Sequence, residues 1–264
     1  MEREKGDRAM YFDSHCHLND EKLFPFAESL VREAENAGLA GMICIGYDAE
    51  ANRRALELAT RYASVYAAVG FHPEAAHQVQ AGDWVEWEEM LKHPKVVAIG
   101  ECGLDYYWEK THIDEQKAVF RRQLIIAAQR GMPVVVHMRE ATEDTRIILS
   151  EPREGTLTGV MHCYSGSVES MRDFLNLGMH ISLAGPVTFK NARQPKEVAV
   201  AVPEGRLLIE TDSPYLAPVP FRGKDNQPAF LPYVCKTIAE LRGTPVEALA
   251  KITTANAERL FGIR

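Results

Sequence analysis

Residues 10–17 read MYFDSHCH, a short apolar run that ends in two histidines separated by one residue. Along a β-strand, residues i and i+2 project from the same face. The imidazoles of His15 and His17 are therefore expected to converge on one point, as two nitrogen ligands of a single metal ion would. An isolated pair is equally compatible with one packed core histidine and one solvated turn residue. The rest of the chain has to decide between these interpretations.

Seven further apolar runs of the same kind follow along the 264 residues. They begin at residues 41 (GMICIG), 64 (SVYAAVG), 96 (VVAIGE), 133 (PVVVH), 158 (TGVMHCY), 179 (MHISLAG) and 206 (RLLIET). Runs that are apolar on both faces are typical of a parallel sheet covered by helices. Eight strands about 21 to 37 residues apart, most of them followed by a helix, predict an α/β fold of the TIM (β/α)8 barrel type.

The segments between the runs carry helical patterns. The clearest covers residues 114–131 (DEQKAVFRRQLIIAAQRG), where Phe120 and Leu124 belong to one apolar stripe and Gly131 is the stop signal. Residues 244–263 predict a final helix that covers the barrel, with Thr244 as its cap and Pro245 in the first helical position. No shift in composition marks a second domain. We expect a flexible leader over residues 1–9 and one barrel domain over residues 10–264.

Composition narrows the functional classes. The net charge of -7 and the pI of about 5.8 exclude a broad basic surface for a nucleic-acid duplex, so any such substrate would be gripped locally. The apolar runs are too short to span a membrane, and no signal peptide is recognisable. Five dispersed cysteines argue against a disulfide framework. These features favour a cytoplasmic protein, and we expect a monomer without an obligate protein partner.

Barrel enzymes carry their chemistry at the C-terminal ends of the strands. If the histidine pair binds metal, other ligands should stand at other strand ends. Seven residues occupy such positions: His15, His17, His72, Glu101, His137, His162 and Asp212. Since five of the nine histidines fall at these ends, whereas His93 and His180 lie at the opposite ends, packing alone does not explain the distribution.

Four imidazoles and two carboxylates exceed the needs of one tetrahedral ion. Two divalent ions that share a carboxylate would use them all, and such a pair suits a displacement reaction. We assign His15, His17, Glu101 and Asp212 to one ion and Glu101, His137 and His162 to the other. The chemistry of the donors allows Zn, Mn or Mg. A single ion with spare polar neighbours is the structural alternative.

A phosphate-bearing substrate would need further donors near the metals. Candidates at the mouth are His72, Arg139, Ser165 and Arg222, because hydroxyl, imidazole and guanidinium groups all donate to phosphate oxygens. The aromatic residues 106–108 (YYW) could stack on a base of a single strand, or pack as a lid on the barrel rim. The cysteines beside three of the proposed ligands are expected to point outward as small buried apolar groups.

The chain resembles the TatD family of metal-dependent hydrolases, which belongs to the amidohydrolase-like barrels. The matching stretches span residues 11–261 and read DSHCHL, GFHPE, GECGLDYY, PVVVHMRE, HCYSGS, ETDSPYLAP, RGKDNQP and NAERLF. The resemblance implies a divalent-metal deoxyribonuclease, typically a 3′-to-5′ exonuclease, and gives metal-ligand roles to the six residues assigned above. DNA ends or single-stranded DNA would be the substrate.

Asp212 is the candidate general base, which would take a proton from a metal-activated water, and Glu101 is the shared carboxylate. Two other functions stay open at this point. The same site could cleave an ester or amide, for example as a D-aminoacyl-tRNA deacylase. A metal-holding binding protein without turnover is the third hypothesis, and the presence of Asp212 in an open mouth counts against it.

Overall fold

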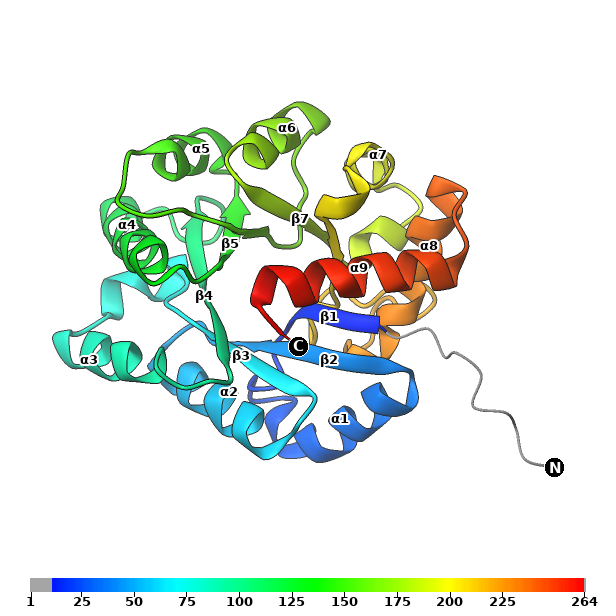
Figure 1. The fold of residues 1–264 in the computed structure, drawn as a ribbon, viewed down its shortest axis with the longest axis horizontal. Coiled ribbons are helices and arrows are strands. Elements are labelled where there is room, and N and C mark those ends of the chain that lie inside the picture. Colours follow the sequence, from blue (N-terminus) through cyan, green and yellow to red (C-terminus); the bar gives the residue numbers. More distant parts are fainter. Residues whose placement is uncertain (1–10, 264) are drawn as a thin grey trace.

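The computed structural model describes residues 11–263, so the predicted leader over residues 1–9 lies outside the described residues. Eight parallel strands follow one another around a barrel in chain order (Figure 1). They are β1 (Tyr11–Cys16), β2 (Leu39–Ile45), β3 (Val65–Val69), β4 (Val96–Asp105), β5 (Val134–Arg139), β6 (Gly159–Met161), β7 (Met179–Leu183) and β8 (Leu207–Ile209). The predicted TIM barrel is confirmed, with a strand at each of the eight apolar runs.

Helices alternate with the strands and form the outer layer (Figure 1). The α-helices are α1 (Ala27–Asn36), α2 (Ala49–Arg61), α3 (Ala81–Met90), α4 (Ile113–Arg130), α5 (Thr142–Ser150), α6 (Val168–Asn176), α7 (Arg193–Ala201), α8 (Leu231–Arg242) and α9 (Val246–Phe261). Short 3-10 helices are η1 (Phe24–Phe26), η2 (Pro73–Gln78), η3 (Gly185–Thr188), η4 (Glu204–Arg206) and η5 (Pro228–Phe230). Within residues 11–263, none of the helices is long and apolar enough to cross a membrane.

The helix patterns are confirmed with one correction. In α4, Phe120 and Leu124 are buried, and Gly131 ends the helix in the left-handed conformation at φ 63°. At the C-terminus, α9 begins at Val246 with Pro245 as its cap, and no side chain caps it. The prediction of Thr244 as cap and Pro245 inside the helix is wrong by one residue. The φ and ψ of Pro245, -57° and 140°, place it in an extended conformation before the first turn.

Two apolar clusters hold the barrel together. The larger one lies between the sheet and the outer helices, and the smaller one fills the barrel interior near the N-terminal strand ends. Phe12, Ile43 and Leu208 from the strands meet Ala257 and Phe261 of α9 in the smaller cluster. Figure 1 shows α9 lying in front of β1. The last helix therefore plugs the end of the barrel opposite the predicted site.

The barrel closes between β1 and β8 through polar contacts. Asp13 accepts hydrogen bonds from the backbone N–H of Thr211 (2.9 Å) and from its hydroxyl (2.6 Å). The hydroxyl of Ser14 donates to the carbonyl of Ile209 at 3.1 Å. These contacts join residues about two hundred positions apart in the chain. They bring the histidines after Asp13 next to the carboxylate that follows Thr211.

Strand β4 is longer than predicted. We expected it to end at Glu101, but it pairs with β5 as far as Asp105, opposite Arg139. Gly103 permits this close pairing, because a Cβ on it would lie 2.0 Å from the carbonyl oxygen of His137. The strand thus carries a second carboxylate, that of Asp105, past the mouth of the barrel.

Candidate metal centre

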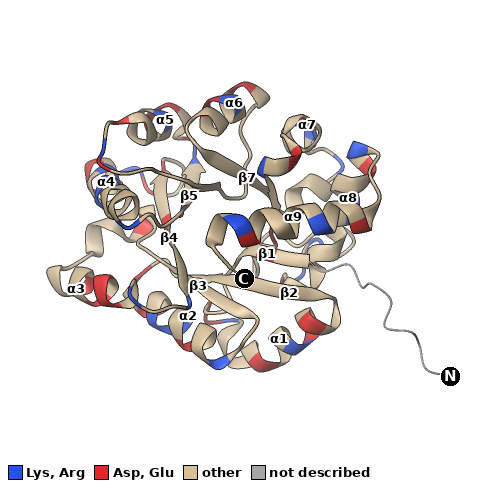
Figure 2. Ribbon diagram, viewed as in Figure 1, with Lys and Arg blue, Asp and Glu red and all other residues tan. Residues whose placement is uncertain are grey.

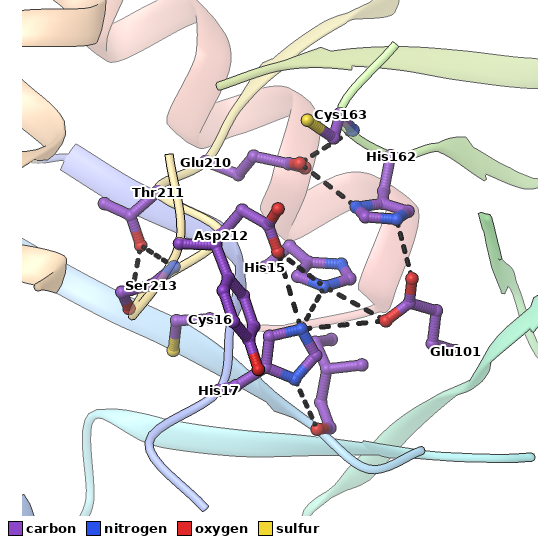
Figure 3. A network of polar contacts seen from close by, with 12 residues as sticks. His15, Cys16, His17, Glu101, His162, Cys163, Glu210, Thr211, Asp212 and Ser213 are labelled. Carbon is purple, nitrogen blue, oxygen red and sulfur yellow. Dashed lines mark hydrogen bonds and ion pairs between the residues drawn. The ribbon is translucent and has the colours of Figure 1, made fainter. Parts of the chain in front are cut away.

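His15, His17 and Asp212 are held together by the backbone at the barrel seam. The N–H of Asp212 donates to the carbonyl of His15 at 2.9 Å, and the N–H of His17 donates to the carbonyl of Ser213 at 2.7 Å. Asp212 adopts a left-handed conformation with φ 57°, which is uncommon for residues other than glycine. This conformation belongs to the residue whose carboxylate meets both histidines (Figure 3).

Four donor atoms form the first group: Nε2 of His15, Nε2 of His17, Oε2 of Glu101 and Oδ1 of Asp212. The two nitrogens are 3.0 Å apart. His15 lies 3.5 Å from each oxygen, and His17 lies 3.6 Å from Glu101 and 3.4 Å from Asp212. Ligand atoms around a tetrahedral ion with bonds of about 2.0–2.1 Å are about 3.3 Å apart. The residues present therefore fit a divalent cation at this point.

A second group surrounds the other oxygen of Glu101. Oε1 lies 2.9 Å from Nδ1 of His137 and 2.7 Å from Nε2 of His162, and these two nitrogens are 3.2 Å apart. Nε2 of His72 lies 3.6 Å from the same oxygen. The two oxygens of one carboxylate thus face two separate sets of nitrogen donors, with Glu101 between them (Figure 3).

Hydrogen bonds fix the tautomers of three of the four proposed histidine ligands. Nδ1 of His17 donates to the carbonyl of Ile45 at 3.1 Å, and Nδ1 of His162 donates to Oε1 of Glu210 at 3.3 Å. Nε2 of His137 donates to Oδ2 of Asp105 at 2.9 Å. In the neutral rings, the opposite nitrogens then direct lone pairs into the cluster. Lone pairs and carboxylate oxygens that converge in this way fit a bound cation.

Electrostatics keep the carboxylates charged. Burial alone would raise the pKa of Glu101, but the neighbouring histidines, above all His162, outweigh it and hold that pKa well below its usual range. Burial likewise opposes ionisation of Asp212, and its contact with His17 more than compensates, so its pKa is lowered too. Both groups are therefore anionic at neutral pH, as cation ligands must be.

His72 stands beside the second group. Its Nδ1 accepts a hydrogen bond from the backbone N–H of Glu74 at 3.2 Å, which leaves Nε2 as the protonated nitrogen facing Glu101. Burial, aided by the neighbouring His137, lowers the pKa of His72 to about 3, so the ring is neutral. His72 therefore lies at the edge of the second donor group, where its Nε2 faces Glu101, and it lines the cleft as well.

An open cleft of about 700 Å³ lies over the two groups. Its wall includes six residues of the donor groups, and around them Tyr47, Asp48, Glu74, Ala75, Gln78, Trp108, Arg139, Tyr215 and Leu216. The guanidinium of Arg139 lies 4.4 Å from the ring centre of Tyr107 and 5.6 Å from that of Trp108. Ser165 and Arg222 are exposed but do not line the cleft, and Arg222 instead covers the ring of Phe189 at 4.4 Å.

The thiols stay apart from the donors. Cys16 donates through Sγ to the carbonyl of Ile43 at 3.3 Å, and both Cys16 and Cys102 belong to the outer apolar cluster. Cys163 is half-buried, and its backbone N–H donates to Glu210 at 2.7 Å. All five cysteines are free. The expected outward orientation is confirmed for Cys16 and Cys102.

Sequence reasoning missed two buried carboxylates that hold the rings, Asp105 and Glu210. Asp105 lies four residues beyond Glu101 on the same strand, and Glu210 precedes Asp212 by two residues. Both spacings place a residue on the same face of an extended chain as a proposed ligand, so the period of two was the available signal. Asp13, which ties β1 to β8, was missed as well.

A TIM barrel with several imidazoles around carboxylates at the C-terminal ends of its strands is typical of metal-dependent hydrolases. Comparison with known proteins supports this class. The family model for TatD related DNase matches residues 12–262. YabD of Bacillus subtilis (strain 168), named an uncharacterized metal-dependent hydrolase, is 44% identical over 254 residues, which cover 96% of this chain and all (100%) of YabD. The chain belongs to the TatD family of metal-dependent hydrolases, and the resemblance noted in the sequence is confirmed.

Two further proteins are similar to this chain. A Shigella flexneri serotype 5b (strain 8401) protein named 3'-5' ssDNA/RNA exonuclease TatD is 36% identical over 258 residues, covering 96% of this chain and 99% of that protein. The crystal structure of YJJV, a TatD homologue from Escherichia coli K12, superposes with a TM-score of 0.89 at 30% identity. That superposition covers 96% of this chain and 98% of YJJV.

Proposed function

We propose that this hydrolase is a divalent-metal-dependent deoxyribonuclease that removes nucleotides from the 3′ end of single-stranded DNA. One observation carries the proposal: the two oxygens of Glu101 face two separate groups of imidazole nitrogens at the floor of an open cleft. Paired cations bridged by a carboxylate suit an in-line displacement at phosphorus, because both the attacking and the leaving oxygen then meet a positive charge.

We assign the ligands as the sequence predicted. His15, His17, Glu101 and Asp212 would hold one cation, and Glu101, His137 and His162 the other, with Zn, Mn or Mg as candidates. When bound, the cations would acidify a coordinated water and stabilise negative charge on the phosphoryl group. Asp105 and Glu210 would position the rings of His137 and His162 through the hydrogen bonds described above.

Asp212 would act as the proton acceptor. Its carboxylate is ionised, supplies one atom of the first donor group and lines the cleft. It can therefore reach both a bound water and the substrate. After accepting a proton from water, it can return that proton to the leaving 3′ oxygen of the shortened strand.

The cleft carries residues that can bind a single strand through local contacts. Local contacts are needed because the chain as a whole is acidic. Figure 2 shows acidic and basic residues interspersed on the outer helices. At the cleft, Arg139 can bind a phosphate, and Trp108, 65% exposed, presents an aromatic face to a base. His72 can donate from Nε2 to a phosphate oxygen. The name of the Shigella relative, 3'-5' ssDNA/RNA exonuclease TatD, supports this substrate class.

The test is metal-dependent degradation of a 5′-labelled single-stranded oligonucleotide. Successive shortening from the 3′ end is expected with the wild-type protein, and a loss of at least about 100-fold with Asp212→Asn. Asp173→Asn, an exposed position on α6, is the matched control and should retain full activity. If the wild type leaves DNA intact with Mg, Mn and Zn but hydrolyses D-aminoacyl-tRNA, the ester-cleaving alternative replaces the nuclease. A cytoplasmic location and a monomeric state stay predictions.

A further inference from the structure

A third group of potential metal ligands lies outside the centre described above. It consists of His77 at the end of η2, with Glu109 and His112 in the loop between β4 and α4. Each can present one ligand atom such that all three atoms lie within 4.8 Å of one another. The two imidazole rings stack with their centres 4.2 Å apart and an interplanar angle of 11°, and because an imidazole binds a cation in its own plane, one ring turns out of this stack when both bind the same ion. None of these residues has a part in the proposed hydrolysis.

Local hydrogen bonds hold the side chains of Glu109 and His77 in place. Oε1 of Glu109 accepts from the backbone N–H of Thr111 at 2.6 Å and of His112 at 3.2 Å, which fixes the carboxylate in the loop. These bonds leave its second oxygen for another partner. Nε2 of His77 accepts a hydrogen bond from the amide nitrogen of Gln78 at 3.2 Å, so this ring nitrogen is unprotonated, and a cation bound to it would take the place of Gln78.

The surroundings favour a cation. Glu115 places a carboxylate oxygen 3.5 Å from Nδ1 of His112, and Asp114 stands beside it in the first turn of α4. His77 is exposed, whereas Glu109 and His112 are half-buried, so water can complete a coordination sphere. Two imidazoles and one carboxylate are a donor set that suits Zn²⁺ and similar transition metals better than the oxygen-seeking Mg²⁺ or Ca²⁺.

We propose that His77, Glu109 and His112 form a peripheral binding site for a transition-metal cation, with Zn²⁺ as the best match. A cation there joins η2 to the β4–α4 loop, two segments that are otherwise far apart in the sequence. Both contribute to the cleft: Gln78 comes from η2 and Trp108 from the loop. Occupancy of the peripheral site therefore fixes the rim of the cleft on the side where Trp108 stands. The proposal does not rest on which bond the enzyme cleaves.

Zinc stoichiometry gives the first test. The wild-type protein and a His77→Ala/His112→Ala variant, which share an intact main centre, are dialysed to equilibrium at increasing Zn²⁺, and bound zinc is measured by elemental analysis. The wild type is expected to bind one equivalent more than the variant. His93→Gln, which alters a histidine outside all the ligand groups found in residues 11–263, should match the wild type. Equal zinc content in wild type and double variant overturns the proposal.

Proteolysis tests the link between the two segments. Lys110 is exposed and lies between two of the ligands, so a cation bound to both would restrain the backbone that trypsin must fit into its active site, and cleavage is expected only from molecules without the cation. At Zn²⁺ tenfold above the dissociation constant, cleavage after Lys110 should slow about 11-fold in the wild type and not in the double variant. Cleavage after the exposed Lys224, far along the chain, serves as the internal reference. An extra equivalent of zinc without protection at Lys110 refutes the joining of η2 to the loop.

Discussion

Asp105 accepts a hydrogen bond from Nε2 of His137 at 2.9 Å, and this bond turns Nδ1 of the same ring toward Glu101, also at 2.9 Å. The carboxylate at the far end of β4 thereby sets which nitrogen of a β5 histidine can bind metal. Asp105 itself is anchored by the backbone N–H groups of Tyr107 (2.8 Å) and Trp108 (2.7 Å). The orientation of a proposed ligand thus depends on the loop that forms the cleft rim.

Asp105→Asn should weaken metal binding at the second donor group by about 10- to 100-fold, because the amide no longer stabilises a proton on Nε2 of His137. Metal affinity measured by competition with a chelator checks this expectation, and hydrolysis should fall with it and recover at higher metal concentration. Asp173→Asn on the exposed face of α6 is the control. Unchanged affinity in Asp105→Asn would show that the ring is held by packing alone.

Glu101→Gln should remove both cations, since a side-chain amide has only one acceptor oxygen and cannot serve two donor groups. His162→Gln, which alters the second group only, should remove one. Elemental analysis of the three proteins after equal dialysis gives the comparison. If both variants lose the same single equivalent, one ion occupies the site, as the structural alternative in the sequence analysis holds.

His180 should make folding stability fall in mild acid. Burial, together with the nearby Arg206 and Arg259, lowers its pKa from 6.5 to about 4. Between these values the unfolded chain binds a proton that the folded one does not, so stability is present above pH 6.5 and is lost as the pH falls toward 4. Because the ring is partly screened by water, the loss by pH 5 is about 1 kcal/mol.

The check for His180 is a pair of urea unfolding series, for the wild type and His180→Gln, at several pH values. The free energy of unfolding of the variant should decline less steeply with acid, since it lacks the group that titrates. Parallel curves for the two proteins would exclude this histidine as a source of acid sensitivity.

Phe261→Ala should destabilise the fold by about 3–5 kcal/mol, because this ring fills the barrel interior together with Phe12 and Leu208. Thermal unfolding measures the effect. The side chain lies at the end of the barrel opposite the donor groups, so metal stoichiometry of the folded variant should stay unchanged. Val200→Ala on the exposed surface of α7, where Val200 is 57% accessible, is the control and should cost under about 0.5 kcal/mol.

The barrel could be predicted from the sequence because each strand is a short run that is apolar on both faces. Only sheets covered on both sides need such runs, and eight of them leave few other topologies. The ends of individual strands and helices could be predicted less well. The extension of β4 to Asp105 depends on pairing with β5, and the start of α9 depends on the backbone angles of Pro245, neither of which a local pattern determines.

The six proposed ligands could be named in advance because imidazoles are rare and their places at strand ends are regular. The structure brings all six together, and their roles as ligands stay a prediction. Substrate contacts were harder to foresee, because loop residues follow no such periodicity. His72 and Arg139 line the cleft, whereas Ser165 and Arg222 do not. Asp105 and Glu210 were missed because the period of two that relates them to proposed ligands does not by itself distinguish a carboxylate that holds a ring from any other acid.

The polar seam between β1 and β8 has a consequence for how activity arises during synthesis. His15 and His17 are made about two hundred residues before Asp212, yet they become neighbours only through this seam. A partly synthesised chain therefore carries the two histidines without the carboxylate that faces them in the folded protein. The first of the proposed donor groups is thus assembled by the same event that closes the barrel.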